Sequence, residues 1–137
     1  MSKDRLQEKF LDYSKAVSRL TDVVQAEETN DYIYDAVIQR FEFTYELAWK
    51  LLKTYMSYNG IADVNSPREA FKEAFASGLI HDGNEWISML KDRNLTTHTY
   101  DETQAIIIYE NIKKHYINLF IGLREKLEGE IRTCGLE

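Results

Sequence analysis

The segment from Arg93 to Tyr100 brings an arginine, an imidazole and a phenol together within eight residues. An arginine side chain holds a phosphate through two charge-assisted hydrogen bonds. Histidine, with an ordinary pKa near neutrality, moves protons to and from a ribose 2′-OH or a leaving oxygen. Arg93 and His98 are therefore candidate catalytic residues for metal-free phosphodiester chemistry.

The local backbone decides whether these side chains converge. On a continuous helix, Arg93 and His98 lie about 140° apart around the axis. If the helix ends near Arg93 and the chain then extends, His98 and Tyr100 project to the same side. Thr96 and Thr97 are only moderate helix formers, so the conformation after Asn94 is less clear. Convergence requires a break between Asn94 and Thr97. The alternative is structural: Arg93 complements a helix C-terminus, and the other two side chains pack on the fold.

A second polar cluster consists of Arg40, Glu42 and Glu46. Glu42 and Glu46 share a helix face one turn apart and would orient Arg40 or Lys50 towards a site. The alternative is an ordinary solvated face. The two tryptophans, Trp49 and Trp86, are predicted to be core anchors.

The sequence does not contain the residues that metal, cofactor or phosphate-loop sites would require. No Glu stands three residues before His81, His98 or His115, so a helical di-iron site is not expected. The lone Cys134 and three scattered histidines make no zinc or haem ligand set. There is no Gly-rich phosphate loop and no Asp-x-Asp pair for two metal ions. We expect no metal and no cofactor, and the chain is not itself a nucleotidyltransferase.

Composition limits the partners. The 137 residues carry a net charge of −6 and suggest one domain over 1–137. Such a charge disfavours broad binding to duplex DNA, which requires many basic side chains. No apolar run approaches the length of a membrane span, and no secretory signal is recognisable at the start. A cytoplasmic location is expected, without a membrane partner.

Apolar spacings of three and four residues predict the elements that position these side chains. The first helix follows the stripe from Leu6 to Val24, and the second begins at Asp31 or Tyr32 and ends before Asn59-Gly60. A third begins at Ser66-Pro67, turns Ala70, Phe71, Ala74 and Phe75 inward and ends at Gly78. Asn84 caps a fourth that runs towards Arg93, and the pair Asp101 and Gln104 opens a last long helix to Leu127. The predicted fold is all-α: an up-down antiparallel helical bundle of four-helix type with an extra short helix.

Two segments together, 39–53 and 93–102, resemble the nucleotidyltransferase substrate-binding protein family of the HEPN superfamily. The second segment carries the full R-N-x-x-x-H-x-Y signature. The resemblance covers nearly the whole chain. It implies a helical bundle that forms homodimers and associates with a minimal nucleotidyltransferase encoded nearby. In related toxin–antitoxin pairs, the HEPN partner is a metal-independent ribonuclease whose R-x4-H motifs meet at the dimer cleft.

Carried over residue by residue, the resemblance implies that Arg93 holds the scissile phosphate and that His98 is the general acid or base. Asn94 would orient the pair, and Tyr100 would accept AMP from the partner transferase, which blocks RNA entry. Arg40 and Glu42 are supporting candidates. A two-fold axis would bring two Arg93 side chains together and create a local positive site.

The aromatic-rich second helix is the leading candidate for the dimer contact, through Phe41, Phe43, Tyr45 and Trp49. Two other hypotheses remain: a non-catalytic subunit that presents a nucleotide or another substrate to the transferase, and a purely structural helical interaction module.

Overall fold

All secondary structure in the computed structural model is helical among the residues it describes, which are 3–27, 29–98 and 101–135. Only the backbone is described at 97, 98 and 133–135. The helices are α1 (Lys3–Val24), α2 (Asp31–Tyr58), α3 (Pro67–Ala76), α4 (Gly83–His98), α5 (Glu102–Asn111) and α6 (Ile117–Gly135). A π-helical turn, η1 (Ile112–Tyr116), joins α5 to α6. The predicted all-α bundle is confirmed.

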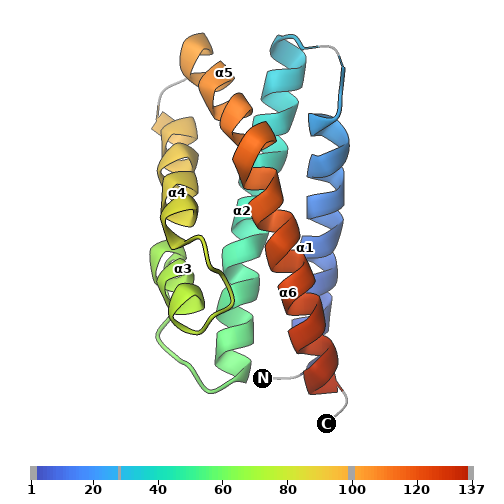
Figure 1. Ribbon diagram of the computed structural model, residues 1–137, viewed down its shortest axis with the longest axis vertical. Coiled ribbons are helices and arrows are strands. Elements are labelled where there is room, and N and C mark those ends of the chain that lie inside the picture. Colours follow the sequence, from blue (N-terminus) through green and yellow to red (C-terminus); the bar gives the residue numbers. More distant parts are fainter. Residues whose placement is uncertain (1–2, 28, 99–100, 136–137) are drawn as a thin grey trace.

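Helix α1 runs antiparallel to α2 and α6, which lie beside it, and the shorter α3 and α4 are stacked along one flank of α2 (Figure 1). The beginning of α1 and the end of α6 lie at the same end of the bundle, while α5 rises to the opposite end (Figure 1). Across the described residues, every helix lacks the length of apolar sequence that a bilayer crossing demands.

Local sequence signals define most helix ends. Asn30 accepts a hydrogen bond from the Ile33 N–H, and Ser66 accepts one from the Glu69 N–H ahead of Pro67. Gly60 adopts a φ of +84° just after α2, in the left-handed region that glycine favours. Asp101 caps α5 by accepting from the Thr103 N–H. The caps expected at Ser66 and Asp101 are thus confirmed.

Three local expectations are wrong, and the helix break that convergence requires is absent. Helix α4 does not break between Asn94 and Thr97 but continues to His98. It also begins at Gly83, where the Asp82 carbonyl accepts from the N–H groups of Glu85 and Trp86. Asn84 therefore lies inside the first turn rather than at the cap. Phe75 is 54% exposed instead of turned inward. The last long helix is interrupted by the π turn.

Aromatic rings fill the centre of the core. Phe120 of α6 packs against Phe41 of α2 and Trp86 of α4, with ring centroids 6.0 and 5.8 Å apart. The Tyr13 hydroxyl of α1 donates to the Phe120 carbonyl at 2.8 Å. Trp86 is buried, so its predicted role as a core anchor is confirmed. Trp49 is only partly buried and packs at the edge of the core.

Buried phenols should make the fold sensitive to alkali. Burial is the main cause that raises the pKa of Tyr13, Tyr45 and Tyr116. Their contribution to stability is present below the unfolded pKa of about 10 and is lost as pH rises through the higher folded values. We therefore expect urea midpoints to fall steadily above about pH 10, when measured by circular dichroism across an alkaline series.

Two phenylalanine variants test the assignment to buried phenols. Tyr13→Phe removes a fully buried phenol and should make the alkaline decline shallower. Tyr32→Phe removes one that is 84% exposed and should leave the decline unchanged. Identical slopes in wild type and Tyr13→Phe would contradict the prediction.

Candidate functional site

Arg93 lies on the face of α4 that packs against α2, and it contacts two carboxylates there. Its guanidinium nitrogens lie 3.8 Å from Glu42 and 3.7 Å from Glu46, one helical turn apart on α2. The guanidinium carbon also lies 5.8 Å from the centre of the Tyr45 ring. We call Glu42 and Glu46 the glutamate pair. The structure thus joins the two polar clusters that the sequence presented separately.

These ion pairs leave the arginine able to bind a further anion. Separations of 3.7 and 3.8 Å exceed the length of a direct hydrogen bond. Within the part of the chain that the structure describes, the buried Arg93 Nε has no hydrogen-bond partner. The side chain is 19% exposed, so it is held firmly yet reaches solvent. Because Nε is buried, a phosphate oxygen would have to reach the terminal nitrogens of the guanidinium.

Glu46 is fixed by more than Arg93. It accepts a hydrogen bond from Trp49 Nε1 at 3.0 Å and lies 3.9 Å from Lys50 Nζ. Sequence reasoning paired the glutamates with Arg40 or Lys50 on their own helix and missed Arg93. Glu46 was placed in the polar cluster with Arg40 and Glu42 but was not among the supporting candidates. The i, i+3 and i, i+4 spacings of Glu46 with Trp49 and Lys50 were the available signal.

Arg93 borders a hollow of about 510 Å³ between α2 and α4. We call it the Arg93 hollow; its lining residues are Ala36, Gln39, Arg40, Glu42, Phe43, Glu46 and Arg93. Arg40 is exposed and Phe43 is 61% exposed, so the hollow opens beside an apolar surface. Asn94 follows Arg93 and is also exposed. Arg40, Glu42 and Arg93 are thus brought together.

The structure describes the other residues of the R-N-x-x-x-H-x-Y signature only in part. Since α4 is continuous to His98, positions 93 and 98 lie about 140° apart around its axis. Within one chain, the backbone therefore places the two positions on different sides of α4, whereas a break after Asn94 would have allowed them to converge. The side chain of His98 and the whole of Tyr100 lie outside the described residues.

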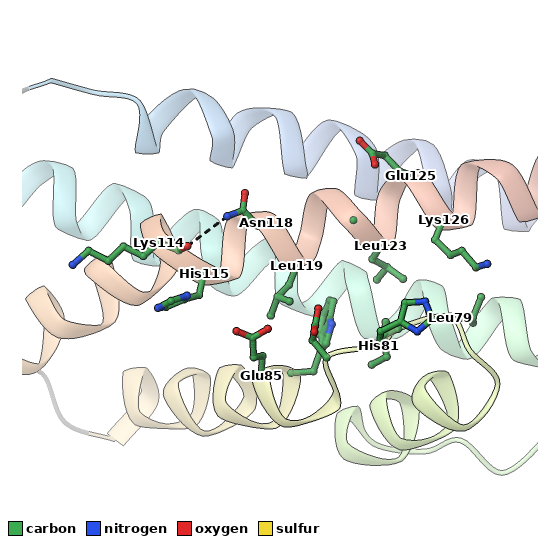
Figure 2. A pocket seen from close by; sticks show the side chains of 14 residues that line it. Leu79, His81, Glu85, Lys114, His115, Asn118, Leu119, Leu123, Glu125 and Lys126 are labelled. Atoms are coloured by element: carbon green, nitrogen blue, oxygen red, sulfur yellow. Dashed lines mark hydrogen bonds between the residues drawn. The ribbon is translucent and has the colours of Figure 1, made fainter.

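A second hollow, of about 650 Å³, lies between α4 and the helices η1 and α6. Figure 2 shows Glu85 of α4 and His115 of η1 entering this space from opposite sides. Its two lysines are already paired on their own helices, Lys114 with Glu110 at 3.4 Å and Lys126 with Glu130 at 3.5 Å. The second hollow is therefore a less favourable binding site for an anion than the Arg93 hollow. In the described residues, no cluster of His, Cys, Asp and Glu is arranged to hold a metal ion.

Fold and site together define a helical-bundle protein that presents an arginine between two glutamates at an open hollow. The chain belongs to the family described as "Nucleotidyltransferase substrate binding protein like", whose profile matches residues 8–129. The expected family is thereby confirmed.

Three similar proteins illustrate the match. The "Probable ribonuclease HepT" of Haemophilus influenzae is 36% identical over 86 residues, which are 60% of this chain and 59% of that protein. The chain thus spans about three fifths of this relative's length. A crystal structure from Thermus thermophilus is 30% identical, with a TM-score of 0.73 over 88% of this chain and 98% of the other.

The third is a tri-AMPylated Shewanella oneidensis HEPN toxin in complex with an MNT antitoxin. Its TM-score is 0.74 over 94% of this chain and 99% of the toxin. At 17% identity, this likeness shows the fold alone.

Proposed function

We propose that this chain is the HEPN-type partner of a minimal nucleotidyltransferase in a toxin–antitoxin pair, and that it cleaves RNA without a metal. The carrying observation is Arg93, which is held between the glutamate pair and lines an open hollow. The family match, the HepT relative and the fold of the AMPylated toxin support the same assignment.

In the proposed reaction, Arg93 binds the non-bridging oxygens of the scissile phosphate. His98 moves the protons as general base or general acid. The 2′-oxygen loses its proton and attacks phosphorus, the bond from phosphorus to the 5′-oxygen breaks, and that oxygen leaves with a proton. The products are a 2′,3′-cyclic phosphate and a 5′-hydroxyl. Asn94, next to Arg93, orients the pair, while Arg40 and Glu42 line the approach.

The proposed site is completed by a second copy of the chain. Positions 93 and 98 diverge around α4, so a two-fold axis supplies a way to bring Arg93 and His98 of two chains to one cleft. Phe43, 61% exposed at the rim of the Arg93 hollow, supports a contact through α2. Two arginines in one cleft also offset, locally, a net charge of −6 per chain.

The partner transferase is proposed to silence this activity by placing AMP on Tyr100. The residue follows His98 by two positions, so the added phosphodiester brings negative charge and bulk beside the catalytic imidazole. The AMPylated state of the Shewanella oneidensis toxin supports this assignment. No metal or cofactor is part of the proposed reaction.

The chain produced alone should arrest growth and degrade cellular RNA, and His98→Ala should relieve both effects. Co-expression with the neighbouring nucleotidyltransferase should also relieve them and add AMP to the wild-type chain. Growth curves, total RNA on gels and the intact mass of the purified chain measure these outcomes. Tyr100→Phe should remain toxic and carry no AMP at that position.

A matched control is His81→Ala, which removes a histidine of the second hollow and should stay toxic. Normal growth with intact RNA at every level of wild-type protein would refute the ribonuclease. If that chain still bound the transferase and a nucleotide, the substrate-presenting subunit would replace our proposal. If variants of Arg93 and His98 altered only the stability of the fold, the purely structural interaction module would replace our proposal.

A further inference from the structure

The carboxylate of Asp92 links the C-terminal half of α4 to the π turn through hydrogen bonds. Asp92 Oδ2 accepts a hydrogen bond from the Tyr116 hydroxyl at 2.6 Å and another from Asn111 Nδ2 at 3.0 Å. Both bonds end on an ionised group, which makes them stronger than bonds between neutral partners. Asp92 stands immediately before Arg93 in the chain.

The π turn brings the two donors to the same carboxylate. Asn111 and Tyr116 are five residues apart, and on an α-helix they would lie about 140° from one another. The wider i→i+5 turn over Ile112–Tyr116 rotates Tyr116 back towards the direction of Asn111. The backbone keeps helical dihedral angles on both sides of the turn, at Asn111 and Ile117. The π turn therefore redirects side chains without interrupting the helical path from α5 to α6.

The Tyr116 phenol is kept in its donating form. Burial raises its pKa above the usual value, and the hydrogen bond to Asp92 raises it further, followed by the charges of Asp92 and Glu85. The phenol therefore remains protonated throughout the neutral range. The hydroxyl is therefore available to donate to Asp92 throughout this range.

The Tyr116 ring connects this bond to the Arg93 hollow. It stacks on Phe41 with centroids 5.7 Å apart and planes inclined by 20°. Phe41 in turn contacts the Tyr45 ring at 6.3 Å, and the Arg93 guanidinium lies over Tyr45. Consecutive residues of α4 are thus held from two directions, Asp92 by η1 and Arg93 by α2.

We propose that Asp92, Asn111 and Tyr116 form a positioning unit that sets the rotation of α4 and so aims Arg93 into its hollow. This inference rests on the proposed function, because the aim of Arg93 matters for cleavage only if Arg93 binds the scissile phosphate. None of the three residues touches RNA in this scheme; they act through Arg93.

The test is Tyr116→Phe, which keeps the ring stacked on Phe41 and removes only the hydroxyl. The rate constant kcat for cleavage of a defined RNA should fall about ten-fold, with KM changed less than about two-fold. The Arg93 Nε–H signal in ¹⁵N NMR, assigned by its loss in Arg93→Lys, should shift and exchange faster with water. Asp92→Asn should have the same effects, and the double variant should add little to either.

The matched control is Tyr55→Phe, which removes another tyrosine hydroxyl bonded to a carboxylate, that of Glu130 at 3.4 Å. It should change neither kcat nor the Arg93 signal. Wild-type kcat in Tyr116→Phe would overturn the inference, and so would a loss of kcat without a change at Arg93. If the wild type cleaves no RNA, the proposed function fails, and the Arg93 signal alone then decides: an unchanged signal in Tyr116→Phe overturns the positioning unit, and a shifted one supports it.

Discussion

An Arg93→Lys variant will lose RNA cleavage by roughly 100- to 1,000-fold while remaining folded. Lysine keeps a positive charge for the glutamate pair, so the contact between α2 and α4 survives. It offers a single point charge in place of the planar fork of donors that grips two phosphate oxygens. Single-turnover cleavage of a defined RNA by purified protein, with circular dichroism as the folding check, measures the difference.

Lysine is a more informative substitution at position 93 than alanine, because it separates the effect on cleavage from the effect on stability. Alanine would remove the cation that lies between Glu42 and Glu46, and repulsion between these two carboxylates would lower stability as well as change the chemistry. The control is Arg132→Lys on α6, where the arginine is exposed and pairs with Glu128 at 2.7 Å. The control should cleave at the wild-type rate. An Arg93→Lys chain that keeps more than about a tenth of that rate would contradict the role we give Arg93.

The largest loss of stability is expected from Phe120→Ala, at about 3–5 kcal/mol in the free energy of unfolding. The ring is fully buried and contacts those of Tyr13, Phe41 and Trp86, so its removal leaves a cavity between α1, α2, α4 and α6. Urea denaturation followed by tryptophan fluorescence measures the change.

Two companion variants keep this test informative. Phe120→Leu refills most of the volume and should cost clearly less than alanine. Phe75→Ala removes a ring that is 54% exposed and should change stability by under about 1 kcal/mol. Equal losses at positions 75 and 120 would show that the aromatic cluster is not the centre of the core.

Helix positions were predictable because apolar periodicity and capping residues are local signals. The ranges of α1, α2 and α3 follow from their stripes and from Asn59-Gly60 and Ser66-Pro67. The sequence left the segment after Asn94 open, and α4 continues through it to His98 because a moderate helix propensity costs little. The Thr96 hydroxyl donates back to the Arg93 carbonyl at 2.7 Å, which satisfies it within the helix.

The contacts within the site could not be predicted from patterns between residues that are close in sequence. Arg93 meets Glu42 and Glu46 across about fifty residues of chain, and only the packing of α4 on α2 brings them together. The π turn is equally hidden, since Ile108, Ile112 and Tyr116 keep spacings of four that an ordinary helix tolerates. Tyr116 therefore looked like one more core position. Its bond to Asp92 emerged only from the folded chain.

The shared end at which α1 begins and α6 finishes has a practical meaning for protein engineering. The glutamate pair lies near the middle of α2, about 20 Å along the axis from that end. A fluorescent domain or affinity tag joined at either terminus would start from the same side of the molecule, away from α5. A reporter placed before α1 or after α6 would thus lie at the end of the bundle that is away from the opening between α2 and α4.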